Sequence, residues 1–289
     1  MRPALLDLRT IAGYALREAV RRKVLVVVVV LTVGFLALYA FGSSEAFKEV
    51  SRSNVASAAG LEDKVLTGST LLGLAMFVTL FLGTVLAVFV TLNAVRGDAE
   101  RGLLQPLVVR PVGRSTLLLA RFLAASVVCV VYVQLVYWAA VLLTGATGGY
   151  WPDNPVYGGL SLAAAVTIIA ALALLGTTLL SATANGIAIF MVFGAGLAAG
   201  LIGQIGSTLD SHTLERISSI AAWALPFEAL YQDGLQALTA DVQGVTGVIV
   251  RLGPFGGAQD AGPWLYPFAV AYLVVTGLLA DRVFRRADL

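Results

Sequence analysis

The chain has 289 residues, of which 58% are hydrophobic and 12% are charged, and its mean hydropathy is +0.88. Soluble domains carry about 25% charged residues, so this composition excludes a soluble globular protein and indicates an integral membrane protein. The formal net charge of +2 is spread over several segments, which argues against nucleic-acid binding, and the single cysteine, Cys129, excludes a disulfide framework.

Residues 1–23 precede the first apolar run and are rich in basic side chains. On a helix, their apolar side chains share one face: Leu5, Leu8, Ile11, Ala12, Ala15 and Ala19. This pattern predicts an amphipathic helix lying on the membrane surface, although the same charge also suits a simple topology anchor. A cleaved signal peptide is disfavoured because the apolar run Val24–Phe41 is longer than the usual range of about 7–15 residues.

Six apolar segments are long enough to cross a bilayer, which needs about 20 mainly apolar residues. They are Val24–Phe41, Leu66–Val95, Phe122–Leu143, Leu160–Leu180, Ile187–Ile205 and Leu265–Leu279. The second is long enough to tilt or to project beyond the bilayer. The chain is therefore predicted to be all-α, with six transmembrane helices.

The connection after the second span, residues 96–116, is rich in arginine and also contains an ordered apolar pattern. The apolar residues fall on one side of a helix: Leu103, Leu104, Leu107 and Val108. Pro111 ends this helix, because the residue before a proline disfavours helical backbone. Such a helix can bury its apolar face in a groove on another protein. Alternatively, the connection only follows the preference for basic residues in cytoplasmic loops, which explains the arginines but not the apolar pattern.

The fourth and fifth spans are joined by little more than residues 181–186, so they are predicted to pack antiparallel. The fifth span carries small residues at a helical spacing: Gly196, Gly200 and Gly203. Small residues at this spacing let helix backbones approach closely. Packing within the chain and dimerisation are equally compatible with the pattern.

Residues 206–263 form the long segment before the last span, and we expect it to be external. Its first part is semi-apolar, is interrupted by Pro226 and carries several acids, so it is too charged to span. We predict a re-entrant segment of two short helices that dip into the outer interface, because irregular backbone at membrane depth must be buried in protein. A purely extracellular cap is the alternative.

The basic residues separate the two sides of the predicted membrane protein. The N-terminal segment, the connection after the second span and the C-terminus together hold 14 of the 19 Lys and Arg residues. The opposite side holds 11 of the 17 acids. Because basic loops remain in the cytoplasm, both termini are predicted to be cytoplasmic.

The predicted spans contain no Asp, Glu, Lys, Arg or His in their apolar centres. Ion-coupled carriers normally need ionisable residues within the membrane, so a secondary transporter is disfavoured. The sequence has no G-x-x-x-x-G-K-[ST] loop for ATP, and its one histidine, His212, cannot form a metal site with one cysteine. We therefore expect no catalytic residue, cofactor or metal in this chain.

Two short motifs lie in the arginine-rich connection. They read Glu100-Arg101-Gly102-Leu103-Leu104-Gln105-x-Leu107, then Pro111-Val112-Gly113-Arg114, with the basic Arg121 after them. They resemble the cytoplasmic signature of ABC-2 type permeases, the transmembrane subunits of ABC transporters. The resemblance extends over the whole chain, so residues 1–289 are expected to form a single ABC-2 type transmembrane domain.

The resemblance implies a coupling helix at residues 98–110 that docks on a separate cytoplasmic ATPase. The docking residues that it implies are Asp98, Glu100, Arg101, Gly102, Leu103, Leu104, Leu107, Val108, Arg110, Pro111 and Arg114. It also implies a dimer of permease subunits in a prokaryotic cell membrane, with ATP and magnesium bound by the ATPase. Closure of the ATPases on ATP would then switch the spans between two states.

Three functions are ranked on this evidence. The first is ATP-driven export, and the apolar spans with scattered Thr and Ser predict a lipid-like or amphipathic cargo. The second is the membrane component of a maturation or assembly system, which would use the external acidic segment to dock an extracytoplasmic partner. The third is an ATP-independent channel or carrier, which the uncharged spans disfavour.

Overall fold

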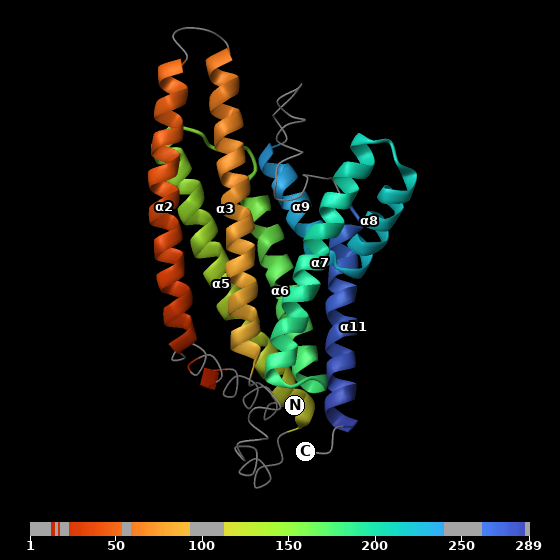
Figure 1. Ribbon diagram of the computed structural model, residues 1–289. Helices are drawn as coiled ribbons and strands as arrows, with labels where there is room; N and C mark the ends of the chain where they lie inside the picture. Colours follow the sequence, from red (N-terminus) through yellow and green to blue (C-terminus); the bar gives the residue numbers. More distant parts are fainter. Residues whose placement is uncertain are drawn as a thin grey trace.

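A computed structural model describes residues 13–14, 17, 23–53, 59–92, 113–239 and 262–286, and within these ranges the chain forms helices and no strand. Six long helices are apolar enough to cross a membrane: α2 (Lys23–Ser53), α3 (Ala59–Thr91), α5 (Arg114–Gly148), α6 (Pro155–Leu179), α7 (Ala182–Thr208) and α11 (Leu265–Arg286). Two short helices, α8 (His212–Ala224) and α9 (Pro226–Thr239), lie between α7 and α11 (Figure 1). The predictions of a helical chain and of six spans are confirmed.

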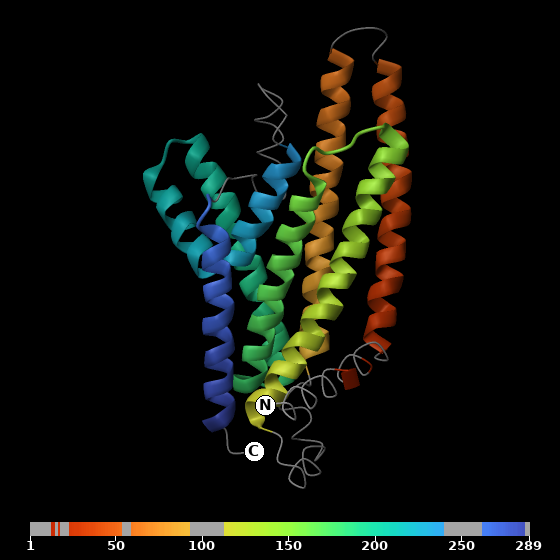
Figure 2. The ribbon, with the colours of Figure 1, turned by 180° about the vertical axis from the view of Figure 1, so that it is seen from behind.

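The long helices form a bundle in which α3 and α6 are the inner members. The apolar windows of α6 and α3 are 67% and 61% buried, whereas those of α2 and α11 are 17% and 22% buried. α6 packs against α3, α5, α7, α9 and α11, while α2 packs against α3 and α5 at the edge (Figure 1, Figure 2). The core therefore centres on α6.

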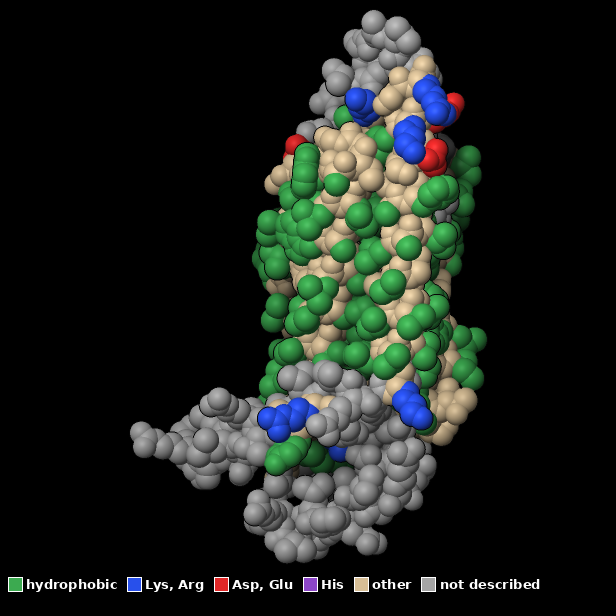
Figure 3. All heavy atoms as spheres, turned by 90° about the vertical axis from the view of Figure 1, so that its left-hand side faces the viewer, with side chains coloured by type: hydrophobic (Ala, Val, Ile, Leu, Met, Phe, Trp, Pro, Cys, Tyr) green, Lys and Arg blue, Asp and Glu red, His purple; other side chains and the backbone are tan. Residues whose placement is uncertain are grey.

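A broad apolar belt covers the outer face formed by α2 and its neighbours (Figure 3). Its exposed side chains on α2 include Val26, Val30, Val33, Leu38 and Phe41. Among the described side chains in this view, charged groups gather at the two ends of the belt. This is the distribution that a bilayer requires, because charged side chains are costly in the hydrocarbon core.

The helix ends differ from the predicted span ends. α2 runs to Ser53 rather than Phe41, α3 ends at Thr91 rather than Val95, and α5 begins at Arg114 rather than Phe122. The 31 residues of α2 make a helix about 46 Å long, against a hydrocarbon core of about 30 Å. α2 and α3 accordingly rise above the other helices at the end where α2 stops and α3 starts (Figure 1).

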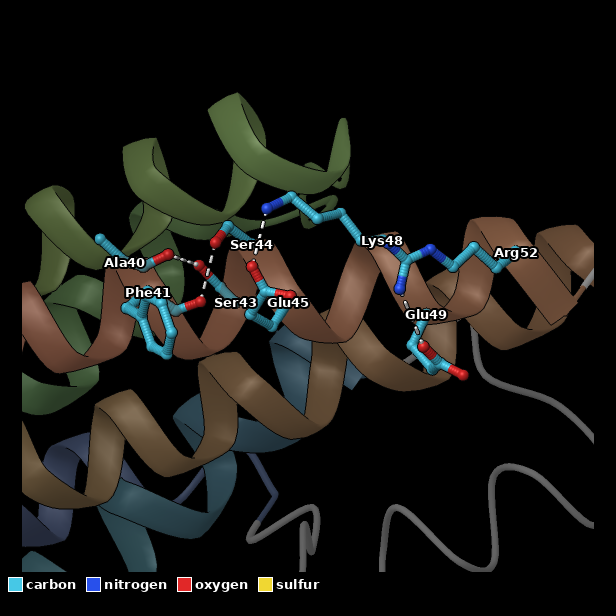
Figure 4. Close-up of polar contacts among 8 residues, drawn as sticks. All are labelled: Ala40, Phe41, Ser43, Ser44, Glu45, Lys48, Glu49 and Arg52. Atoms are coloured by element: carbon cyan, nitrogen blue, oxygen red, sulfur yellow. Dashed lines mark hydrogen bonds and ion pairs between the residues drawn. The ribbon is translucent and has the colours of Figure 1, made fainter.

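Short-range polar contacts keep this projecting end of α2 helical (Figure 4). The hydroxyls of Ser43 and Ser44 donate to main-chain carbonyls one turn earlier, at 3.1 and 2.8 Å. Two exposed ion pairs follow: Lys48–Glu45 at 2.7 Å and Arg52–Glu49 at 3.6 Å. Opposite charges three residues apart favour helix. The predicted span ends at Phe41 because the apolar run in the sequence ends there. The helix itself continues to Ser53.

α6 and α7 are joined only by Leu180 and Ser181, so the short connection expected between these spans is present. Ser181 caps α7, because its Oγ accepts a hydrogen bond from the main-chain N–H of Ala184 at 3.5 Å. Asn185 donates its Nδ2 to the carbonyl of Ala173 at 2.9 Å. A Cβ at Gly176 would lie 1.8 Å from Asn185 Oδ1. Glycine at position 176 therefore makes room for the side chain that ties the two helices together.

α8 turns back alongside α7, and α9 then runs back into the bundle, where it packs against α6, α7, α3 and α11 (Figure 1, Figure 2). Pro226 begins α9, a position that suits proline because its missing N–H would be unpaired there in any case. α8 holds no buried residue, although Trp223 packs edge-on against Phe268 of α11 with ring centroids 4.5 Å apart. The two short helices expected in residues 206–263 are present, and residues 240–261 lie outside the described ranges.

Two other predicted elements lie almost wholly outside the described residues. These are the amphipathic helix over residues 1–23 and the coupling-helix loop over residues 96–116. Both stay predictions.

Candidate functional site

The helices that flank the predicted docking loop stop and start at the same end of the bundle. α3 ends at Thr91 and α5 begins at Arg114, and the end of α11 lies beside them (Figure 1, Figure 2). The predicted docking residues from Asp98 to Pro111 lie outside the described ranges, while Arg114 is the first residue of α5. The structure does describe the first two turns of α5, residues 114–120, which connect the loop to the bundle. These two turns are called the foot of α5.

A polar contact ties the foot of α5 to the last span. Arg285 of α11 donates from Nη2 to Ser115 Oγ at 2.8 Å, and the same Nη2 lies 2.9 Å from Asp281 Oδ2. Asp281 precedes Arg285 by one helical turn, so it holds the guanidinium toward Ser115. Ser115 is the second residue of α5, directly after Arg114.

An apolar cluster reinforces this connection one turn further into the bundle. Its buried members are Leu118 on α5, Leu174 on α6, and Ala280 and Phe284 on α11. Phe284 is 3% exposed. The foot of α5 is thus packed and hydrogen-bonded to α11.

The second notable feature is α9, a short helix buried on all sides. Every residue from Pro226 to Leu235 is buried, although three of them are polar: Glu228, Gln232 and Asp233. A helix buried all round is normally apolar, since a polar group without partners is costly in a protein interior. The surroundings of these three side chains are therefore informative.

Asp233 lies in a hydrogen-bond network with α6 and α11. Tyr157 donates to its Oδ2 at 2.6 Å, and Tyr266 donates to the same oxygen at 3.2 Å. Ser161 Oγ and Tyr266 Oη hydrogen-bond at 2.8 Å. Two hydroxyl donors compensate the burial of the carboxylate, so Asp233 joins α9 to two spans.

Glu228 lies on another side of α9 and is less well compensated. Its Oε1 accepts a hydrogen bond from Gln232 Nε2 at 3.1 Å, whereas its buried Oε2 has no hydrogen-bond partner among the described residues. α9 is not one of the six spans. Burial raises the pKa of the Glu228 carboxyl to about 7, because desolvation penalises the charged form more than the Gln232 hydrogen bond favours it.

Two of the small residues predicted in the fifth span, Gly196 and Gly200, face this helix. A Cβ at Gly196 would lie 2.7 Å from Phe227 Cζ, and a Cβ at Gly200 would lie 2.7 Å from Glu228 Oε1. Gly203 is also buried. The glycine pattern was compatible with packing within the chain and with dimerisation. Gly196 and Gly200 lie against α9 of the same chain, which agrees with packing within the chain.

The buried acids on α9 were not identified from the sequence, where they appear as ordinary charges of an external segment. The sequence pattern points away from burial: on a helix, Glu228, Gln232, Gln236 and Thr239 share one face, which is typical of an amphipathic helix with one exposed side. His212, by contrast, is exposed, and its Nδ1 lies 3.7 Å from Glu215. Among the described residues no group of three or more His, Cys, Asp and Glu side chains is placed to hold a metal ion.

Six apolar helices around a buried core define a polytopic α-helical membrane protein. A family model described as ABC-2 family transporter protein matches residues 9–289, so the chain belongs to that family. A search of curated proteins found no match. The resemblance found in the arginine-rich connection is thereby confirmed.

Family membership settles the broad function. The chain is the membrane permease of an ABC-2 transporter, and members of this family lack the ATPase domain. The chain is therefore not an enzyme, it needs no cofactor of its own, and it implies a separate ATPase partner that binds ATP and magnesium.

Proposed function

We propose that this permease is driven by a cytoplasmic ATPase that docks on residues 98–110, and that it exports a lipid-like or amphipathic cargo. The observation that carries the proposal is the position of the loop between α3 and α5, directly before a foot that is bonded to α11 through Ser115 and Arg285. A push on the loop would move α5 and α11 together, which is a rigid-body route from the ATPase to the spans.

The proposed orientation places the starts of α2 and α5 and the end of α11 in the cytoplasm of a prokaryotic cell. The support is charge: Lys23 starts α2, Arg114 starts α5, and α11 ends at Arg285 and Arg286. Basic residues next to membrane helices favour the cytoplasmic side. On this orientation α8 and α9 form a re-entrant segment at the outer side.

The apolar outer surface supports the proposed class of cargo. α7 exposes a strip of apolar side chains: Ile187, Met191, Leu201 and Ile205. Three buried threonines keep their hydroxyl hydrogens within their own helices, because Thr79, Thr84 and Thr177 donate to main-chain carbonyls at 2.6, 2.8 and 2.7 Å. A cargo with a large apolar part suits these surfaces better than a highly charged one.

The proposed transporter contains a second permease, either a copy of this chain or a homologue, so that two permeases enclose the path and two ATPases drive it. The exposed strip of α7 offers that second permease an apolar surface to pack against.

Reconstitution tests this function. The permease purified together with its ATPase would be placed in vesicles that contain a fluorescent phospholipid analogue, with a soluble anionic polysaccharide as the second probe. We expect ATP-dependent movement of the lipid probe, and none when the Walker lysine of the ATPase is replaced. Movement of the polysaccharide alone would overturn the proposed cargo class, and movement of either probe without ATP would overturn ATP-driven export.

One observation favours the second candidate function, docking of an extracytoplasmic partner. α2 and α3 project beyond the other helices, and α2 carries exposed charges there: Glu45, Lys48, Glu49 and Arg52 (Figure 4). Such a charged projection suits a polar protein partner. A photocrosslinker at residue 49 would capture a soluble extracytoplasmic protein if this function were correct, and would capture only lipid or the permease itself if it were not.

A further inference from the structure

Glu228 combines burial with incomplete hydrogen bonding. The residue is 3% exposed, and its carboxyl oxygen Oε2 has no hydrogen-bond partner among the described residues. Among the described residues, its other oxygen accepts a hydrogen bond from Gln232 alone, and Gln232 is itself 8% exposed. The hydroxyl of Tyr231, three residues after Glu228 on α9, is also buried without a hydrogen-bond partner among the described residues.

The described elements around Glu228 provide no compensating charge. α7 faces it with Gly200 and has no titratable side chain along its length. On α6 and α11, Tyr157 and Tyr266 point to Asp233 rather than to Glu228. The ionisable residues of α8 are exposed: His212, Glu215 and Arg216. α3 carries only Glu62, Asp63 and Lys64, all within its first turns.

An ionised carboxylate is therefore unfavourable in this position. Moving an unpaired charge out of water costs far more than moving the neutral acid, so a buried carboxyl without a cation takes up a proton. The glycine at position 200 strengthens this effect, because it lets the α7 backbone close over the carboxyl and leaves no space beside it.

We propose that Glu228 is a proton-binding site that couples the seating of α9 against α7 to protonation. With α9 seated, the carboxylate has taken a proton from water and is a neutral acid. When α9 moves away from α7, water reaches the carboxyl and the proton returns to water. The direction of the raised pKa, caused mainly by desolvation, agrees with this geometry.

The consequence is a pH-dependent stability of the seated state. The pKa of Glu228 rises from its ordinary value of 4.5 to about 7 on burial. The folded protein then holds more protons than the unfolded chain between these two values, so stability is greatest below 4.5 and falls as the pH rises toward 7. Above that range the contribution of Glu228 to the free energy of unfolding no longer changes with pH.

Infrared difference spectroscopy tests the proposal on the full-length protein in lipid nanodiscs. The carbonyl stretch of a protonated carboxyl would be followed from about pH 4 to about pH 9 for the wild type, Glu228→Gln and the control Glu215→Gln, whose carboxyl is exposed. We expect a band that disappears with a midpoint near the raised pKa of Glu228, that is absent from Glu228→Gln and that is retained in Glu215→Gln. A wild-type band that never titrates, or one that Glu228→Gln leaves in place, would overturn the proposal.

Thermal melting provides the second measurement. We expect the melting temperature of the wild type to fall as the pH rises between 4.5 and about 7, and Glu228→Gln to remove that slope. If Glu228→Gln fails to fold, Glu228→Asp keeps the acid and should shift both the infrared midpoint and the melting slope. Identical pH profiles in the wild type and in Glu228→Asp would contradict a proton site at this residue.

Discussion

Gly196 and Gly200 show how an absent side chain can position a neighbouring helix. Each faces α9, where Phe227 and Glu228 occupy the space that a Cβ would need. Phe227 also stacks on Phe193 of α7, with ring centroids 6.0 Å apart. The close approach of α7 and α9 thus depends on these two positions of the fifth span.

Replacing Gly200 with alanine should loosen this contact. The new Cβ would lie 2.4 Å from Gln232 Nε2 and 2.7 Å from Glu228 Oε1, so either these two buried side chains or one of the helices must shift. Overpacking of this kind costs about 1–3 kcal/mol, which thermal unfolding in nanodiscs would measure. Gly194→Ala is the matched control on the same helix, because a Cβ there meets nothing within 4 Å. Equal effects of the two substitutions would contradict the assigned packing.

Tyr157→Phe should weaken the attachment of α9 to α6. It removes the 2.6 Å hydrogen bond to Asp233 and leaves that buried carboxylate with fewer donors. A hydrogen bond to a charged group is worth about 1.5–3 kcal/mol, and we expect a loss of stability in this range by thermal unfolding. A combined Tyr157→Phe and Asp233→Asn variant should lose less than the sum of the single variants, whereas full additivity would mean that the two side chains do not interact.

At the scale of elements, the foot of α5 is the structural link between the predicted docking loop and the spans. Its first turn bonds to α11 through Ser115, and its second packs in the cluster that contains Phe284. α11 is otherwise a peripheral helix, with only 22% of its apolar window buried. α11 also packs against α6 and α9, so its movement together with α5 belongs to the proposed function.

Arg285→Ala and Ser115→Ala should both reduce coupling while leaving ATPase binding intact. Each removes the 2.8 Å contact between α11 and α5. Substitutions along a coupling route change coupling by about 0.5–2 kcal/mol, so permease-dependent ATP hydrolysis should fall about 2- to 30-fold. Arg286→Ala removes the same charge from the neighbouring exposed residue and is the control. Loss of ATPase binding in Ser115→Ala would instead make this region part of the docking surface.

The sequence predicted the centres of the elements better than their ends. Span centres follow from hydropathy, which is a local property, and all six are present. The end of α2 was missed because its ion pairs extend the helix past the apolar region. The burial of Glu228 was missed because it depends on Gly200, which lies on another helix and contacts α9 only in the fold. The docking loop lies outside the described residues, so its predicted register stays a prediction.

At the scale of the whole molecule, the two ends of the bundle are built differently. One end gathers the starts of α2 and α5 with the end of α11, and these termini are basic. The opposite end holds the projecting pair α2 and α3, together with the end of α7 and the end of α9 (Figure 1). This polarity agrees with a permease that receives an ATPase at one face and meets cargo or a partner at the other.

Leu104→Asp or Leu107→Asp should abolish ATPase docking without affecting membrane insertion. Each substitution places a charge on the predicted apolar face of the coupling helix, and an unpaired charge buried in an interface is strongly unfavourable. We expect at least a 10-fold loss of ATPase binding, corresponding to about 1.4 kcal/mol or more. Gln105→Asp adds the same charge beside that face and is the control. If it were as damaging as Leu107→Asp, the predicted register of the helix would be wrong.

The most direct measurement of the central claim is affinity purification of the full-length chain from native membranes in mild detergent, followed by mass spectrometry of the chains that accompany it. We expect a stoichiometric cytoplasmic protein with a Walker ATP-binding motif, lost in Leu107→Asp and retained in Gln105→Asp. If the chain were recovered without an ATPase, even after photocrosslinking from positions 101 and 110, the proposed docking on residues 98–110 would be contradicted.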